Sequence, residues 1–575
     1  LWAGANPAAY HATNIALHLA ASGLLFALLG QLGCTRGWSL ALALALAAHP
    51  ALAPAVAWIP GRNDSLLAIF LFISMIALIR GRRSGKWPWY LLHFSALGCG
   101  LLTKETAAVF PLVLAAYLLL VAREKPLSRR VLVLLAAWAG VVLVWLALMR
   151  SALQPAGPWP SVGLNSAGDD LIGLLTYIGK VWLPFNLSAL PVPRDMTVAW
   201  GAAAVALMAA LFAGGIADIG TFLFGAVWFA LLLLPMLART AGSAIFLEHR
   251  LYLPLAGMMV MVSRSALLRR WSHRRAAPVA AAAVIAGYGC LAFGHSAAYR
   301  DGPSFWDNAV RRSPHSNCAH SGLGQRLAEA GLNQRAGAEF DTALQLDPRD
   351  AISRGELGIL YLKSGAYAQA EQQLQASLAL DPSSAVMRSN LGFLYLQQGR
   401  LGEAGQELDR AMALDPAIAD LRYNRGCLDL KLGRAAQAEQ ELRAAVRLSP
   451  AHAAAHHQLG YLFLAQGRLD QALSEFRTAR DLGLELPELH YNMGVVLSQQ
   501  GDLAAAVGEF RTALQLRPGY LNAERGLGIV HLLQGDRRAA AAELSAVLQA
   551  HPADTVARYY LGRLRVPNAA PSGGR

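Results

Sequence analysis

Residues 246–254 read FLEHRLYLP and set several ionisable side chains against an apolar run at 251–268. Ionisable groups at membrane depth are costly, and they usually line a cavity or a pathway. The Arg250 guanidinium has a fork shape that fits phosphate oxygens, so we expect it to contact a phosphate. Glu248 could orient Arg250 or an acceptor group. Tyr252 could belong to the same site or anchor the chain at the membrane interface.

Other polar groups precede this segment. Two polar residues follow His11 at intervals of three and seven residues, Asn14 and His18. In a helix all three therefore share one face. We expect that face to turn into a helix bundle, where it could bind a substrate or hydrogen-bond to neighbouring helices. Arg62 and Asp64 flank a helix start and are candidates for substrate binding. Asp64 could instead cap the helix and form an ion pair.

Three further candidates lie farther along the chain. Lys104 and Glu105 occupy a very short turn between two apolar runs. They could take part in catalysis or form only a local salt bridge. Lys180 lies on an amphipathic stretch that leads to Pro184 and is expected to rest in the membrane interface. Its amine could reach a lipid phosphate or extend to the headgroups.

The elements that must hold these groups are membrane helices. Of the 575 residues, 55% are hydrophobic and 15% are charged, which is too apolar for an all-soluble protein. Residues 1–300 hold 22 basic and 8 acidic residues, whereas the remainder holds 28 and 29. The basic excess therefore lies beside the apolar runs, which favours a membrane over a nucleic-acid partner. The five cysteines have no metal-ligand spacing, and we expect no metal site.

About ten apolar runs are long enough to cross the roughly 30 Å hydrocarbon core of a bilayer. Dense basic clusters at 80–86, 123–130 and 269–275 assign these three loops to the cytoplasmic side. Alternation then places the polar motifs and the loop 151–196 together on the extracytoplasmic side. The runs are residues 9–34, 38–59, 64–79, 88–102, 105–122, 131–149, 197–217, 219–238, 251–268 and 277–296.

The sequence after residue 316 repeats with a period of 34, which is the length of a tetratricopeptide repeat (TPR). Glycine and alanine recur where two helices must approach closely, and proline recurs in the turn between repeats. Seven repeats fit between 317 and 554, and an eighth begins at Thr555. We predict a membrane domain at 1–299, a linker at 300–316, a TPR solenoid at 317–566 and a disordered tail at 567–575.

The ordered motifs resemble those of a known family. The chain is similar to the transmembrane and TPR proteins of the GT-C glycosyltransferase superfamily, relatives of the protein O-mannosyltransferases. The resemblance covers nearly the whole chain and is carried by YHATN (10–14), GRND (61–64), LTKE (102–105), YIGK (177–180) and EHRLYLP (248–254), followed by the repeats. It implies an all-α fold: a polytopic transmembrane bundle followed by a TPR α-solenoid. It also implies transfer of a sugar, typically mannose, from a polyprenyl-phosphate carrier to protein hydroxyls on the extracytoplasmic side.

This chemistry needs a carboxylate that accepts the proton of the acceptor hydroxyl and cations that stabilise the leaving lipid phosphate. The lipid-linked sugar is then a substrate, and no cofactor is implied. The resemblance and the residue types together assign catalytic roles to Glu248, Arg250, Tyr252, Lys104 and Glu105, and substrate-binding roles to His11, Asn14, Arg62, Asp64 and Lys180.

In this family the key acidic residue lies in the first extracytoplasmic loop, which we expect to precede Leu1 in a longer protein. Asp169 and Asp170 could supply the carboxylate instead, although an aspartate at a helix start more commonly caps it. The richness in Ala, Leu, Gly and Arg indicates a GC-rich bacterial genome. We therefore expect an integral protein of a bacterial inner membrane, with the TPR domain outside the cytoplasm.

The predicted solenoid presents a concave groove lined by the first helix of each repeat. Asn390, Asn424 and Asn492 share one position, two residues before the repeat glycine. Their amides could hydrogen-bond an extended peptide, in a way that resembles the asparagine ladder of another repeat-bearing glycosyltransferase, or they could simply be frequent at this position. Two functions follow: a glycosyltransferase whose repeats bind the acceptor or a partner protein, or a non-catalytic membrane-anchored scaffold.

Overall fold

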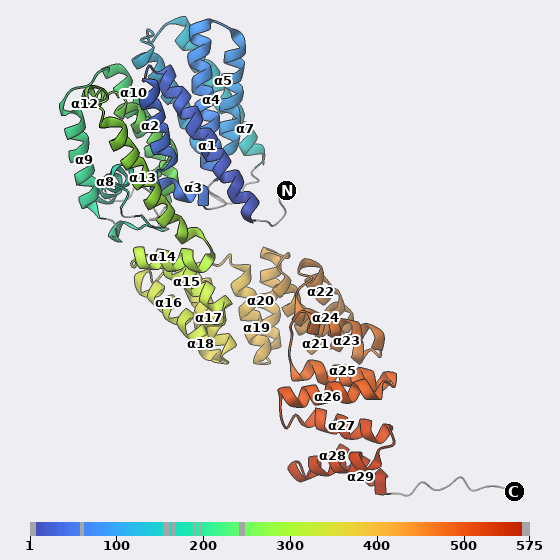
Figure 1. Cartoon of the computed structure of the whole chain (residues 1–575). Helices are drawn as coiled ribbons and strands as arrows, with labels where there is room; N and C mark the ends of the chain where they lie inside the picture. Colours follow the sequence, from blue (N-terminus) through green and yellow to red (C-terminus); the bar gives the residue numbers. More distant parts are fainter. Residues whose placement is uncertain are drawn as a thin grey trace, which may run out of the picture. The chain divides into compact units, whose positions relative to one another are not determined.

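A computed structural model shows a helical protein, which confirms the all-α prediction (Figure 1). The chain divides into two compact units, Leu1–Pro348 and Arg349–Arg575. The short pairing of β1 (Val162–Gly163) with β2 (Arg239–Thr240) is antiparallel. The described residues are 7–57, 62–152, 162–163, 167–185, 187–188, 190–195, 197–237, 239–240 and 248–565.

The apolar part of the first unit is a helix bundle (Figure 1). Several of its predicted runs are divided into two or three shorter helices. The helices are α1 (Pro7–Gln31), α2 (Arg36–Ala47), η1 (Pro50–Leu52), α3 (Ala53–Ala57), α4 (Arg62–Ser84), α5 (Trp87–Thr103), η3 (Glu105–Val109), α6 (Phe110–Ala116), η4 (Tyr117–Val121), α7 (Arg129–Ala152), α8 (Ala167–Trp182), η5 (Pro193–Asp195), α9 (Val198–Ala213), α10 (Ile219–Leu237), η6 (Glu248–Leu251), α11 (Tyr252–Val262), α12 (Ala266–Trp271), α13 (Ala277–Ser296) and η7 (Ala297–Tyr299).

Four helices in the described part of the chain are long and apolar enough to cross a membrane. A fifth candidate joins Arg36–Ala47 to Pro50–Ala57 across a bend of 51°. Shorter apolar helices occupy other predicted runs. The composition of a run shows how apolar it is, but not where its backbone turns. The four long helices are Ala8–Gln31, Arg62–Ser84, Arg129–Ser151 and Ala277–Tyr299.

Close packing holds the bundle together, since helices in lipid gain little from leaving water. The span α4 lies against α1 and α5, and its Leu71 and Phe72 have no exposed surface. Helices α10 and α11 cross at Gly225 and Gly257. A Cβ on Gly257 would lie 2.7 Å from the backbone nitrogen of Phe229 and 2.8 Å from the carbonyl oxygen of Gly225. Only glycine therefore allows this approach.

Two of the predicted basic loops, 80–86 and 123–130, meet at one end of the bundle. The Nε atom of Arg82 donates to the Glu124 carboxylate at 3.0 Å. Arg83 reaches the side chain of Gln31, at the end of α1, at 2.7 Å. Arg264 donates to the carbonyl oxygen of Leu32 at 2.6 Å. The ends of α1 and α4, the start of α7 and the end of α11 thus share this basic end.

The first repeat belongs to the same compact unit as the bundle. It follows α14 (Gly302–Arg312), whose start is capped by the Asp301 side chain, and consists of α15 (Asn317–Glu329) and α16 (Asn333–Leu346). Two contacts tie this region to the loop after α8. The hydroxyls of Ser188 and Ser313 lie 2.9 Å apart, and His315 Nδ1 lies 2.6 Å from the Asp195 carboxylate.

The second unit is a regular array of helix pairs (Figure 1). Small residues allow the helices of a pair to touch: a Cβ on Gly392 would lie 2.8 Å from Leu408. In the turn between the same two helices Gly399 has φ +76°, a conformation that favours glycine. The helices are α17 (Ala351–Lys363), α18 (Tyr367–Leu380), α19 (Ala385–Gln397), α20 (Leu401–Leu414), α21 (Ala419–Lys431), α22 (Ala435–Leu448), α23 (Ala453–Ala465), α24 (Leu469–Asp481), α25 (Pro487–Gln500), α26 (Leu503–Leu516), α27 (Leu521–Leu533), α28 (Arg537–Ala550) and α29 (Thr555–Arg565).

A recurring side-chain contact joins the two helices of most repeats, and we call it the repeat clasp. A histidine or arginine on the first helix faces a glutamate 19 residues later on the second. The α27–α28 pair carries two carboxylates at these positions, Glu524 and Glu543. The clasps are His320–Glu339 (2.7 Å), Arg388–Glu407 (3.0 Å), Arg422–Glu441 (2.9 Å), His456–Glu475 (2.6 Å) and His490–Glu509 (2.7 Å).

His457 gives the array a predicted sensitivity to acid. Its ring lies 5.7 Å from that of Phe476, and burial lowers the pKa of His457 from 6.5 while Glu488 partly opposes the shift. The unfolded chain therefore binds this proton more tightly, so stability is lost as the pH falls through and below about 6.5. We expect the Tm to fall between about pH 7.5 and pH 5, and His457→Gln to make that fall smaller.

Thermal unfolding of the purified full chain at several pH values measures this effect. His551→Gln, which removes an exposed histidine, is the matched control. Equal pH dependence of the Tm in His457→Gln and in the wild type would contradict the assignment.

Candidate functional site

An ion pair joins two of the predicted motifs. Asp64 lies in the first turn of α4, where the free amides of the helix favour a carboxylate. Lys104 directly follows α5 and donates from Nζ to Oδ1 of Asp64 at 2.6 Å. The side chain of Lys104 is 21% exposed and that of Asp64 is 10% exposed. Lys104 therefore pairs across 40 residues, while its neighbour Glu105 is exposed.

A second pair joins α1 to the start of α11. Nε2 of His18 lies 3.0 Å from the carbonyl oxygen of Ala47, which can only accept a hydrogen bond. Nε2 therefore carries the proton in the neutral ring. Nδ1, which is 2.6 Å from the Tyr252 hydroxyl, then accepts a hydrogen bond from it. Both side chains are buried, so this bond ties α1 to the start of α11 inside the bundle.

The two pairs adjoin. Asp64 and Ser65, at the start of α4, lie within electrostatic range of the Tyr252 hydroxyl. We call His18, Asp64, Ser65, Lys104 and Tyr252 the Asp64 cluster. It combines a carboxylate, a cation and two hydroxyls from four segments of the bundle, a set that can bind an anion and hold a hydroxyl in place.

The remaining predicted residues of α1 and α4 lie beside this cluster. Asn14 is buried, and its Nδ2 donates to the carbonyl oxygen of Val56 at 3.1 Å. This contact is the packing role that the sequence left open for Asn14. The Arg62 guanidinium is exposed and lies 5.7 Å from the centre of the Tyr10 ring, and His11 is half-buried.

Arg250 lies in η6, two residues before Tyr252. Their Cα atoms are therefore within about 7 Å of each other, which brings η6 to the Asp64 cluster. The Arg250 side chain is exposed and forms no ion pair with any residue that the structure describes. The predicted carboxylates of Glu248, Asp169 and Asp170 lie outside the described side chains.

Lys180 is 3% exposed near the end of α8. The next residue, Val181, accepts a hydrogen bond from Nε2 of His49 at 2.9 Å, and Nδ1 of His49 accepts from the Ala51 amide at 3.3 Å. Sequence reasoning missed His49, although it precedes Pro50 inside an apolar run. It also missed Ser65, whose type and position carry no comparable signal.

The three repeat asparagines have different surroundings. Asn424 is buried, and its Nδ2 donates to the Ser389 hydroxyl of the preceding repeat at 3.0 Å. Asn390 is half-buried, and its Nδ2 donates within its own helix to Val386 at 3.0 Å. Asn492 is 9% exposed. The amide of Asn424 thus links two neighbouring repeats.

A pocket of about 430 Å³ lies among the first helices of the last repeats, α25, α27 and α29. Its apolar part includes Tyr491, Val530 and Tyr560, and its polar part includes Asn522 and Arg525. Burial raises the pKa of the Tyr491 phenol, so that phenol stays protonated and can donate a hydrogen bond. The pocket suits a ligand with both apolar and hydrogen-bonding groups.

Residues 3–149 match the family model described as dolichyl-phosphate-mannose-protein mannosyltransferase. The matched segment contains His18, Asp64 and Lys104 of the Asp64 cluster. Tetratricopeptide-repeat models match residues 327–386, 361–424, 423–483, 457–521 and 497–564.

Curated relatives carry the name protein O-mannosyl-transferase. TMTC2 of Mus musculus is 29% identical over 224 residues, which cover 36% of this chain and 27% of the mouse protein. TMTC2 of Homo sapiens is 34% identical over 119 residues, covering 20% of this chain and 14% of the human protein. The chain thus spans about a quarter or less of the length of these relatives.

Among solved structures, PilF of Pseudomonas aeruginosa is 22% identical with a TM-score of 0.35, covering 38% of this chain and 100% of that one. PilW, a type IV pilus biogenesis factor, is 19% identical with a TM-score of 0.32, covering 36% and 96%. At these scores neither supports an inference. The family matches agree with the prediction from the motifs: this membrane protein joins a segment that matches the dolichyl-phosphate-mannose-protein mannosyltransferase model to an array that matches tetratricopeptide-repeat models.

Proposed function

We propose that this protein transfers a sugar, typically mannose, from a polyprenyl-phosphate carrier to hydroxyl groups of proteins outside the cytoplasm. One observation carries the proposal: the mannosyltransferase match contains His18, Asp64 and Lys104, and these residues gather with Tyr252 in one cluster. The names of the curated relatives support the same reaction.

Arg250 and Lys104 are the proposed contacts of the donor phosphate. The exposed guanidinium of Arg250 can give two parallel hydrogen bonds to phosphate oxygens. The Lys104 ammonium is held by Asp64, so its position is fixed before the donor binds. Charge grows on the phosphate as the sugar leaves, and fixed cations stabilise that state without reorganising.

The acceptor hydroxyl needs a carboxylate to take its proton. The Asp64 carboxylate is mostly buried and already faces Lys104. Glu105 is exposed, so we propose its carboxylate as the base among the described residues. Tyr252 is buried and bonded to His18, so its proposed role is to position η6 and therefore Arg250.

We further propose that the Asp64 cluster and the repeats lie outside the cytoplasm, in a bacterial inner membrane. The end of α1, the basic end of α4 and the basic start of α7 meet away from the cluster, and positive charge favours the cytoplasmic side. Helix α13 begins next to Arg275 and leads along the chain to α14 and the first repeat. An alkaline phosphatase fused after Arg575 is expected to be active, and one inserted after Lys125 inactive. The reverse pattern would contradict this orientation.

We propose that the array binds the acceptor protein or a partner through the pocket on α25, α27 and α29. Its mixture of tyrosines with Asn522 and Arg525 suits a polypeptide, which offers side chains and backbone polar groups together. In a transfer assay Tyr560→Ala is expected to raise the KM for a protein acceptor and leave the KM for the donor unchanged. An unchanged acceptor KM would argue against this pocket.

The reaction is tested with the full chain in membranes, a labelled polyprenyl-phosphate mannose and extracytoplasmic proteins as acceptors. We expect transfer by the wild type and a rate lower by about 10²-fold in Arg250→Ala, since loss of one fixed charge-stabilising donor costs about that much. Arg274→Ala, which removes an exposed arginine from a basic loop, is the matched control and should keep the wild-type rate.

Equal rates in Arg250→Ala and the wild type would remove Arg250 from the donor site. Absence of transfer from wild-type membranes, with this donor and with other polyprenyl-phosphate sugars, would contradict the enzyme and favour the membrane-anchored scaffold. The partners bound by the array would then define its function.

A further inference from the structure

Helices α5 and α7 run side by side and leave a groove open along their length. Two cavities of about 570 Å³ and about 390 Å³ lie between them, and both are lined by Ala137, so they form one groove. Its α5 wall extends from Tyr90 to Leu102, which is about 18 Å at 1.5 Å per residue. This length is close to one leaflet of the roughly 30 Å hydrocarbon core.

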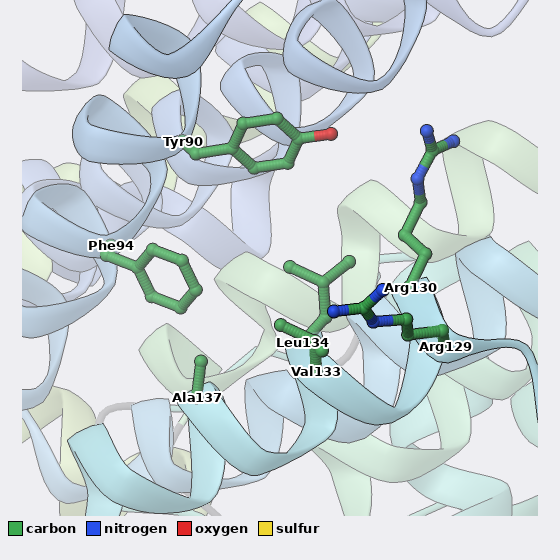
Figure 2. Close-up of a pocket in the computed structure, with 7 residues that line it drawn as sticks. All are labelled: Tyr90, Phe94, Arg129, Arg130, Val133, Leu134 and Ala137. Atoms are coloured by element: carbon green, nitrogen blue, oxygen red, sulfur yellow. The ribbon is translucent and has the colours of Figure 1, made fainter. Parts of the chain in front are cut away.

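The groove is basic at one end and apolar at the other. Figure 2 shows the rings of Tyr90 and Phe94 on α5 opposite Arg129 and Arg130 on α7, with Val133 and Leu134 between the arginines and Ala137. The far end is lined by Leu101, Leu102 and Leu148, and Leu102 is 74% exposed. Such a surface fits a molecule with an anionic head and a single long apolar chain.

The charge at the basic end is only partly neutralised. Arg130 lies 3.4 Å from the Glu124 carboxylate, which also binds Arg82 at 3.0 Å. Arg129 is exposed and forms no ion pair with the residues described around it. Two guanidinium groups therefore share one carboxylate beside a third, Arg129, and the amides at the start of α7 add to the positive potential. A bound phosphate would neutralise the remaining positive charge.

Two glycines keep the middle of the groove open. Gly98 on α5 and Gly140 on α7 both line it, and a Cβ on either would meet no atom within 4 Å. The absent side chains therefore leave space in the groove itself and do not serve a helix contact. An acyl chain lying there would also contact Trp145.

The geometry points to a binding site for an anionic glycerophospholipid of the leaflet on the basic side. Its phosphate lies against Arg129, Arg130 and the Tyr90 hydroxyl, and one acyl chain fills the groove between α5 and α7. Basic pockets between membrane helices are suited to such headgroups. The headgroup end of the site is separate from the sugar-transfer reaction, because about 20 Å of α5 separates Tyr90 from Lys104, whereas the apolar end reaches Leu102.

Quenching of Trp145 fluorescence tests the site in the full chain. The protein is reconstituted in phosphatidylcholine nanodiscs that contain a few mole per cent of phosphatidylglycerol with brominated acyl chains. The signal of Trp145 is the difference between the wild type and Trp145→Phe. We expect brominated phosphatidylglycerol to quench Trp145 with on the order of tenfold higher apparent affinity than brominated phosphatidylcholine.

The variants separate the two parts of the site. Arg129→Gln with Arg130→Gln should remove the preference for the anionic lipid, whereas Arg274→Gln with Arg275→Gln should keep it. Gly140→Leu should remove quenching by both lipids, and Gly287→Leu, at a glycine that also faces open space on α13, should change neither.

Equal quenching by the two brominated lipids in the wild type would overturn the proposal and leave an ordinary lipid-facing groove. Displacement of phosphatidylglycerol by an equimolar polyprenyl phosphate, but not by unlabelled phosphatidylglycerol, would also overturn it, because the groove would then hold the carrier lipid. Sugar transfer measured in the same variants keeps the two proposals distinguishable.

Discussion

Gly257→Leu is expected to leave almost no folded protein in the membrane. A Cβ at this position would lie 2.7 Å and 2.8 Å from backbone atoms of α10, which cannot rotate away as a side chain can. Extra methylenes in a packed interior cost about 1–3 kcal/mol, and contact with backbone places this substitution at or above the upper end of that range. Separation of α10 from α11 would also displace Tyr252 and Arg250.

The yield of monodisperse protein after detergent extraction measures this effect, together with the fraction that survives heating. Gly257→Ala should give an intermediate result, since it adds only the first carbon. Gly289→Leu on α13 is the matched control, because its Cβ would meet nothing within 4 Å. Normal yield and Tm for Gly257→Leu would show that α10 and α11 can separate without loss of the fold.

Lys104→Ala is expected to lower sugar transfer by about 10³-fold, which is more than the loss expected for Arg250→Ala. The substitution removes a proposed phosphate contact and also leaves the Asp64 carboxylate mostly buried without its partner. Breaking a buried pair from one side costs about 3–5 kcal/mol. Part of the lost rate would therefore come from local distortion around Tyr252.

A double variant with two neutral side chains separates loss of the phosphate contact from local distortion. Lys104→Gln with Asp64→Asn keeps a hydrogen bond but removes both charges, so the Tm should return close to that of the wild type. If Lys104 stabilises the leaving phosphate, this double variant stays inactive at normal expression and Tm. Recovery of transfer in the double variant would make the pair structural and exclude Lys104 from the reaction.

The repeats could be predicted from the sequence because their determinants are local. A small residue such as Gly392 and the turn glycine Gly399 recur every 34 residues, and each acts on the helix next to it. The helix boundaries of the bundle could be predicted less well. The apolar run 38–59 bends at His49 and Pro50, and the run 251–268 ends its helix at Val262, although hydropathy alone continues through both breaks.

The candidate site could be predicted in part. Residue types selected Asp64, Lys104 and Tyr252, since charge and hydroxyl groups beside apolar runs are conspicuous. Their pairing could not be predicted, because His18 and Tyr252 are 234 residues apart and Asp64 and Lys104 are 40 apart. Such contacts depend on which helices adjoin in space, and a single sequence does not contain that information.

The repeat clasps have a consequence for how the array opens. In a linear array each repeat is stabilised mainly by contacts within itself and with its neighbours. Unfolding therefore starts at the repeat in which these contacts are weakest. The α27–α28 pair has Glu524 and Glu543 where five of the six preceding helix pairs have a histidine or arginine facing a glutamate, and the described residues beyond it form only α29. Unfolding should therefore progress from the C-terminal end inward. The residues of α27 and α28 should exchange their amide hydrogens before those of α23 and α24. They should also be cleaved first by a protease.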